Sequence, residues 1–128
     1  KNTLRGQKGE DSLSGGKGND RLFGAEGHDT LNGGADNDRL FGGKGNDVLI
    51  GGEGDDFLSG GEWADTFIFE DGFGTDVIGD FAKKDLEKID LSAVSVARRT
   101  FDVAGHYSRP DVFRLEVNRE PRGPITMQ

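Results

Sequence analysis

Aspartates recur at every ninth position through the first half of the sequence, each within a glycine-rich run. The repeated pattern is Gly-Gly-x-Gly-x-Asp-x-apolar-x, and it continues without a gap from Gly6 to Ile68. Carboxylate and carbonyl oxygens are the ligands that a hard cation such as Ca²⁺ prefers, and glycine adopts the positive φ that turns carbonyls inward. These residues therefore suit cation binding through Asp11, Asp20, Asp29, Asp38, Asp47, Asp56 and Asp65.

A large apolar residue follows two positions after each aspartate. Nine residues are too few for a helical repeat, and glycine this frequent disfavours helix. The three residues around each apolar residue predict a short strand, and the six before it predict a turn. We expect an all-β fold, a right-handed parallel β-roll with two nonapeptide repeats per coil and a C-terminal capping segment. Successive coils would stack as parallel strands about 4.8 Å apart. The apolar residues are Leu13, Leu22, Leu31, Leu40, Leu49, Leu58 and Phe67.

The composition indicates that such a roll needs a cation. The chain has 22 glycines, no cysteine, 32% hydrophobic residues and a net charge of −8. Aspartates 18 residues apart would stack, and two carboxylates about 5 Å apart repel by roughly 1 kcal/mol in water and about 3 kcal/mol at an effective dielectric of 20. A thin leucine core should not offset that repulsion, so we expect binding and folding to be one event.

The ends of the repeat array differ from its middle. We expect the roll to span residues 1–81, with a degenerate closing turn over 69–81 and aromatic residues, Trp63 included, packed at its end. Asn2, Thr3 and Leu4 look like the end of a repeat, which predicts that the sequence is a piece of a longer protein. Residues 82–128 would form a flank that is a cap, a partly disordered segment or an export-related segment. Within it, Asp111–Val117 alternates as a strand does.

Arginine and phenylalanine repeat on one outward face. Phe23 and Phe41 are 18 residues apart, as are Arg21 and Arg39, so each pair should stack. One interpretation is a cross-strand ladder that stabilises the sheet. The other is an exposed face that docks a polymer or a neighbouring domain.

Other functional motifs find little support. No stretch has the EF-hand pattern, and the glycine–lysine pairs lack the Ser or Thr of a phosphate-binding loop. His28 lies in a turn where only its backbone would matter, and His106 has no second histidine or cysteine nearby. Periodic carboxylates are accounted for by a metal, and no nucleophile and base are evident, so we expect no catalytic or cofactor-binding residues and no enzyme activity. The acidic balance disfavours nucleic acid, and no apolar run is long enough for a membrane helix.

The stretch from Gly6 to Phe81 closely resembles the β-roll of RTX (repeats-in-toxin, haemolysin-type) proteins of bacteria. The segment from Phe67 to Phe81 resembles how such arrays close in secreted metalloproteases and alginate epimerase modules. The resemblance implies an ion between turns two units apart. The earlier turn would give its Asp and the carbonyls of its second and fourth residues. The later turn would give its Asp and the carbonyls of its first and third residues.

Carried onto this sequence, the resemblance implies five ions, and a sixth between Asp56 and Asp76 if the shifted closing turn stays in step. Sites that use Gln7, Ala25 or Asp36 in place of glycine should be weaker. The implied carbonyl donors are Gln7, Gly9, Gly15, Gly16, Lys17, Gly18, Gly24, Ala25, Glu26, Gly27, Gly33, Gly34, Ala35, Asp36, Gly42, Gly43, Lys44, Gly45, Gly51, Gly52, Glu53, Gly54, Gly60 and Glu62.

The function that the resemblance implies is that of a calcium-binding module. It would fold on Ca²⁺ binding and serve the secretion, folding and stabilisation of a larger bacterial protein exported by type I secretion to the extracellular space. The alternative is a polysaccharide- or partner-binding module of a surface adhesin or an alginate-modifying enzyme.

Overall fold

The computed structural model describes residues 1–81, 85–94, 101–103 and 113–117, and these residues form strands and turns without an α-helix. The predicted all-β fold is confirmed. The strands are β1 (Thr3–Lys8), β2 (Ser12–Lys17), β3 (Arg21–Glu26), β4 (Thr30–Ala35), β5 (Arg39–Lys44), β6 (Val48–Glu53), β7 (Phe57–Glu62), β8 (Thr66–Glu70), β9 (Thr75–Ile78), β10 (Lys88–Ala93), β11 (Phe101–Val103) and β12 (Phe113–Val117).

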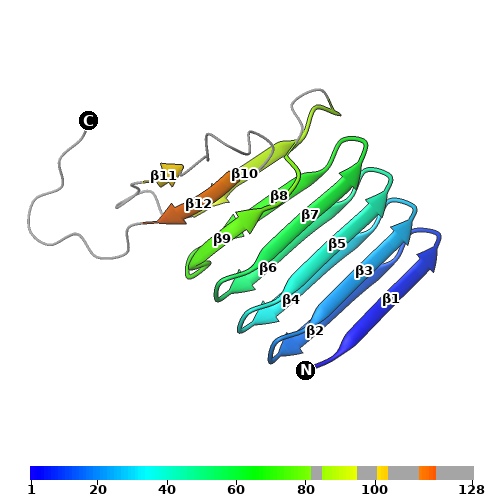
Figure 1. Cartoon of the computed structure of the whole chain (residues 1–128), viewed down its shortest axis with the longest axis horizontal. Coiled ribbons are helices and arrows are strands. Elements are labelled where there is room, and N and C mark those ends of the chain that lie inside the picture. The colour runs from blue at the N-terminus through cyan, green and yellow to red at the C-terminus, as the bar shows by residue number, and fades with distance from the viewer. Residues whose placement is uncertain (82–84, 95–100, 104–112, 118–128) are drawn as a thin grey trace, which may run out of the picture.

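Consecutive strands from β1 to β10 alternate between two sheets, so that the chain winds as a parallel β-roll (Figure 1). One sheet has the order β1-β3-β5-β7-β9-β12-β11, and the other has the order β10-β8-β6-β4-β2. Strands two apart in the chain pair in parallel, with Leu22 opposite Leu40 and Leu31 opposite Leu49. The predicted coil of two repeats is therefore confirmed.

A double row of leucines fills the space between the sheets. Leu22, Leu31, Leu40, Leu49 and Leu58 are fully buried. The row is half-buried at the N-terminal end of the roll, where Leu4 and Leu13 pack against the cluster. Alternate residues of each strand point outward, because successive side chains of a strand face opposite sides. The core is one residue thick per strand, as the repeat pattern predicts.

The strands are longer than the prediction of three residues around each leucine. Each of β1 to β7 has six residues, because pairing continues through the first three positions of the following repeat. Gly16 pairs with Gly34, and Lys17 pairs with Ala35. The extended pairing is possible because the glycine turns of successive coils lie in the same register. After the repeats, β8 has five residues and β9 has four.

Aromatic and aliphatic side chains close the C-terminal end of the roll. Phe67, Phe69 and Phe73 are buried, and Phe69 and Phe73 meet edge to face with ring centroids 5.0 Å apart. Beyond them, β10 adds to one sheet in parallel, and β12 pairs antiparallel with β9 in the other. The predicted tail strand is thus present over Phe113–Val117, and the other residues of the tail prediction lie outside the described ranges.

Trp63 does not pack at the end of the roll, contrary to expectation. Its side chain is 59% exposed and lies beside His28, with ring centroids 6.3 Å apart. The reason is its place in the turn between β7 and β8, outside the strands whose alternate side chains face the core. Within the described part of the chain, we find no helix with the length and apolar character needed to cross a membrane.

Candidate metal centres

Two ladders of aspartates run along opposite edges of the roll, one for each set of turns. We call them the odd ladder (Asp11, Asp29, Asp47 and Asp65) and the even ladder (Asp20, Asp38, Asp56 and Asp76). Within each ladder, Oδ1 of one aspartate accepts a hydrogen bond from the backbone N–H of the aspartate one coil earlier. The N–O distances are 2.8 Å along the odd ladder, and 2.7, 2.7 and 2.8 Å along the even ladder.

The sequence left open whether Asp76 aligns with Asp56, and the structure shows that it does. The closing turn has two extra residues, so that 20 residues separate the two aspartates. Phe57 nevertheless pairs with Val77 in parallel register, so the two extra residues are accommodated before β9 and the strands stay aligned. Asp76 is therefore a full member of the even ladder.

The second oxygen of every ladder carboxylate has no hydrogen-bond partner. Oδ2 is shielded from solvent in all eight ladder residues. The ladder aspartates other than Asp11 are 1–3% exposed. A buried charge without a partner is strongly unfavourable, so each of these oxygens requires a cation or a proton. The protein by itself therefore does not supply a partner for the second oxygen of these carboxylates.

Backbone carbonyls converge on the same places as the unpartnered oxygens. A methyl group on Gly15 would lie 2.7 Å from Asp20 Oδ2 and 2.6 Å from the Gly33 carbonyl oxygen of the next coil. A methyl group on Gly33 would meet Asp38 Oδ2 at 2.5 Å and the Gly51 carbonyl oxygen at 2.6 Å. Only glycine leaves room for these oxygens, and oxygens at such spacing form a cradle that suits Ca²⁺.

The carbonyls of the second and fourth positions point in the opposite direction, toward the later coil. The Gly16 carbonyl oxygen abuts Gly34, and the Gly27 carbonyl oxygen abuts Gly45. Each space between coils thus receives carbonyls from both the turn below and the turn above. These directions are those that the resemblance implies for the first, second and fourth positions.

Four turns keep this geometry without glycine. Gln7, Ala25, Asp36 and Trp63 have φ between 77° and 88°, a region that ordinary residues seldom occupy. Their carbonyls can therefore point as glycine's would, at a cost in backbone strain of order 1–3 kcal/mol each. Weaker ion binding at the sites that use Gln7, Ala25 or Asp36 stays a prediction.

Side chains of the third position play no part in the cradle. Lys17, Glu26, Lys44, Glu53 and Glu62 are exposed at the ends of their strands, and Ala35 is intermediate. Only their carbonyls could serve as ligands, and that role stays a prediction.

Burial raises the pKa of five ladder carboxyls well above the ordinary value of a carboxyl group. It raises the pKa of Asp38 and Asp47 to about 6, that of Asp56 and Asp65 to about 7, and that of Asp76 to about 9. Backbone amides that donate to Oδ1 oppose the rise, and the neighbouring carboxylate of the ladder adds to it. Protons and cations therefore compete for the same oxygens.

No group of three or more acidic, histidine or cysteine side chains meets at one point within the described residues. This fits the arrangement found, in which each space between coils holds two carboxylates and several carbonyls. Oxygen ligands of this mixed kind are typical of Ca²⁺ sites. The residues present therefore fit calcium.

One acidic residue on the odd ladder escaped the sequence reasoning. Glu87 directly precedes β10, in the position that an aspartate holds before each earlier strand of that sheet. The only signal in the sequence was an acidic residue two positions before Ile89, but its 22-residue distance from Asp65 breaks the repeat. The consequence is developed below.

Stacked turns lined by carboxylates and carbonyls define a calcium-binding β-roll. The RTX calcium-binding nonapeptide repeat matches residues 1–31 and 32–67 in four copies, and the chain belongs to this family. The predicted family is therefore confirmed.

Curated proteins with local similarity are nitrilases, and the chain covers only a small part of each. It is 50% identical to nitrilase 3 of Arabidopsis thaliana over 38 residues, which are 30% of this chain and 11% of that protein. It is 39% identical to an aliphatic nitrilase of Sinorhizobium fredii over 61 residues, 45% of this chain and 20% of that protein. The search of solved structures gave no significant match.

Proposed function

We propose that this chain is a module that folds when it binds calcium and thereby serves the secretion, folding and stabilisation of a larger bacterial protein exported by type I secretion. The observation that carries the proposal is the row of eight buried Oδ2 atoms without hydrogen-bond partners. Bound calcium would supply the positive charge that these ladders lack. Because the ladders run through most of the roll, the fold should depend on that charge.

The coupling of folding to binding supports a role in export. Cytosolic calcium is low and extracellular calcium is high, so a chain of this kind would stay unfolded inside the cell and fold outside. Five ions would occupy the spaces between the seven predicted units, and a sixth would occupy the space between Asp56 and Asp76. The extracellular location is part of the same proposal.

Circular dichroism with and without calcium tests the proposal. In excess chelator at neutral pH, the chain should be largely disordered, and excess Ca²⁺ should restore the β-sheet spectrum. Calorimetric titration should count about six ions per chain. Full β-structure in chelator, or two or fewer ions bound, would refute the proposal.

A second function, binding of an acidic polysaccharide, is favoured by the outward face of the seven-stranded sheet. Phe23 and Phe41 stack with ring centroids 5.0 Å apart, and the Arg5 guanidinium lies 4.6 Å from the centre of the Phe23 ring. Arg21 and Arg39 pair in neighbouring strands and are exposed. The stacked rings were predicted, and the structure confirms them.

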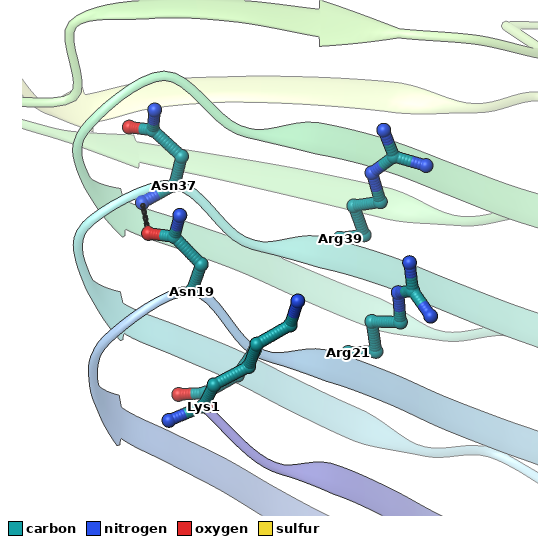
Figure 2. Close-up of a pocket in the computed structure, with 6 residues that line it drawn as sticks. Lys1, Asn19, Arg21, Asn37 and Arg39 are labelled. Carbon is teal, nitrogen blue, oxygen red and sulfur yellow. Dashed lines mark hydrogen bonds and ion pairs between the residues drawn. The ribbon is translucent and has the colours of Figure 1, made fainter.

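A shallow pocket beside this face supports the second function. It is lined by Lys1, Asn19, Asn37, the two arginines and the buried Asp20, and Figure 2 shows the Arg21 and Arg39 side chains extending from adjacent strands. The backbone N–H of Asn37 donates to Asn19 Oδ1 at 3.0 Å, which fixes the turn beside the arginines. A row of cations with amide neighbours suits repeated carboxylates of a polymer.

Retention on an alginate column in calcium buffer tests this second function. The wild-type chain should be retained, and the double variant Arg21→Ala with Arg39→Ala should elute early, because exposed charges give most of such binding. Lys44→Ala, a cation on a turn away from the pocket, serves as a control. If the double arginine variant is retained as strongly as the Lys44→Ala control, the proposed polysaccharide binding is refuted, whereas the proposed calcium binding is unaffected.

We also propose that the chain itself is not an enzyme. The periodic carboxylates are accounted for by cation binding, and the nitrilase match covers 11% of nitrilase 3. An assay of the isolated chain for nitrile hydrolysis is expected to show no turnover, and any calcium-independent turnover would contradict this.

A further inference from the structure

The odd ladder does not end at Asp65. Lys88 pairs in parallel register with Thr66, so Glu87 stands one coil beyond Asp65. The Lys88 backbone N–H donates to the Asp65 carbonyl at 2.9 Å, and Thr66 makes the same bond with Asp47 at 2.8 Å. Glu87 therefore occupies an aspartate position of the ladder, although the connecting loop is longer than that of a repeat.

The side chain of Glu87 is turned into the protein. It is only 9% exposed, although its neighbour Leu86 is 75% exposed. Asp65, below it, is 1% exposed, and its Oδ1 accepts from the Asp47 backbone N–H at 2.8 Å. Asp65 Oδ2 has no hydrogen-bond partner, and we find no ion pair to Asp65 among the described residues. Two buried carboxylates thus face one another across a coil without a cation for Asp65.

Asp80 adds a third negative charge and is itself held in place. Its Oδ2 accepts from Ser59 Oγ and from the Gly61 backbone N–H, both at 2.8 Å, and its Oδ1 accepts from the Gly60 N–H at 3.0 Å. The pKa of Asp65 is raised to about 7, chiefly by burial and in smaller part by the negative charges of Asp47, Glu87 and Asp80. Asp80 is occupied by its three donors, so it acts as a nearby charge, whereas Glu87 is the next member of the ladder after Asp65.

The turn before Asp65 is shaped to supply carbonyls as well. Gly61 and Trp63 hold its second and fourth positions with φ of 99° and 82°. In the coils below, carbonyls at these positions abut the next coil, as Gly43 does against Gly61. Trp63 keeps the positive φ that the fourth position has in the coils below, and a carbonyl directed at a ligand would give a reason to keep this strain at a residue other than glycine.

We propose that Asp65, Glu87 and the carbonyls of Gly61 and Trp63 form a closing calcium site at the C-terminal end of the odd ladder. The proposal rests on the calcium function proposed above and adds one ion to it. Glutamate suits this place because its longer side chain reaches across a coil that carries extra residues, and because it can bind Ca²⁺ through both oxygens. The site would join β10 to the roll, so that calcium also fixes the closing strand.

Terbium luminescence gives a readout specific to this end of the roll. Tb³⁺ replaces Ca²⁺ in oxygen sites, and Trp63 is the only tryptophan in the chain, so light absorbed by it sensitises ions bound nearby. The wild-type chain should show this emission, and added calcium should quench it by displacement. Glu87→Gln should lower the emission at least about twofold, and calorimetry should count one calcium fewer.

Two further variants keep the experiment decisive. Asp11→Asn, at the far end of the odd ladder, should also lose one ion but leave the tryptophan-sensitised emission unchanged. If Glu87→Gln fails to fold, Glu87→Asp keeps the charge on a shorter side chain, and it should fold with weakened emission. Unchanged emission and ion count in the folded Glu87 variants would overturn the closing site and leave the proposed function standing. A wild-type chain that binds no calcium would overturn both.

Discussion

The two oxygens of a ladder aspartate have different surroundings. From Asp20 onward, Oδ1 accepts a hydrogen bond from a backbone N–H of the preceding coil and so helps to set the spacing of the turns, whereas Oδ2 has no hydrogen-bond partner and is the oxygen that we propose binds calcium. Asp47 illustrates the consequence, because it faces Asp29 on one side and Asp65 on the other. An interior aspartate should therefore serve two sites, and Asp11, at the end of the ladder, only one.

We predict that Asp47→Asn binds about two fewer calcium ions than the wild-type chain, whereas Asp11→Asn binds about one fewer. Asparagine keeps the side-chain oxygen that accepts the backbone N–H but removes the negative charge that Ca²⁺ prefers. Calorimetric titration gives the counts, and circular dichroism in excess calcium checks that both variants fold. Equal losses in the two variants would mean that Asp47 is not shared.

The strands contribute a core that is thin but continuous. Each of β3 to β7 buries one leucine completely, and the rows touch along the whole roll. Outside the core, stacked Phe23 and Phe41 cover the seven-stranded sheet. Hydrophobic contact in this fold is therefore between neighbouring coils only, as is usual for solenoids.

We predict that Leu40→Ala lowers the free energy of unfolding of the calcium-bound chain by about 2–5 kcal/mol, because it opens a cavity in a core with no second layer to collapse into it. Urea unfolding in excess calcium measures the loss. Thr30→Ala, an exposed residue at the start of β4, should change it by less than about 0.5 kcal/mol. A loss for Leu40→Ala no larger than this control would show that the leucine row matters little.

At the scale of the whole molecule, the stability of the fold depends on repulsion among the ladder carboxylates and on the cations or protons that neutralise them. Burial raises the pKa of Asp56 and Asp65 to about 7, well above the value of about 3.9 in an unfolded chain. Without calcium, the folded chain therefore binds more protons than the unfolded chain between about pH 4 and pH 7. The free energy of unfolding must then fall as the pH rises through this window.

We predict that calcium-free chain gains β-structure when the pH is lowered from about 7.5 to about 4.5, because protons neutralise the ladder carboxyls. Calcium affinity should change in the opposite direction and rise with pH over the same range, since calcium must displace these protons. Circular dichroism of calcium-stripped protein and titrations at several pH values measure the two trends. Affinity that is independent of pH would show that the buried carboxyls do not titrate in this range.

The nine-residue period determined most of this protein. It places Leu22 over Leu40 and Asp29 over Asp47 because strands of equal repeats can align in only one register without breaking the alternation of core and surface. From that period follow the roll, the two ladders, the stacked phenylalanines and the cation chemistry of the turns.

Tertiary structure decided what happens where the period fails. Asp76 and Glu87 lie 20 and 22 residues beyond their ladder neighbours, yet strand pairing brings both into line, because backbone hydrogen bonds align the strands and loops absorb the extra residues. Counting along the sequence left Asp76 conditional and missed Glu87. Only the folded chain likewise shows that Trp63 faces solvent and that the second oxygen of each ladder aspartate is buried without a hydrogen-bond partner.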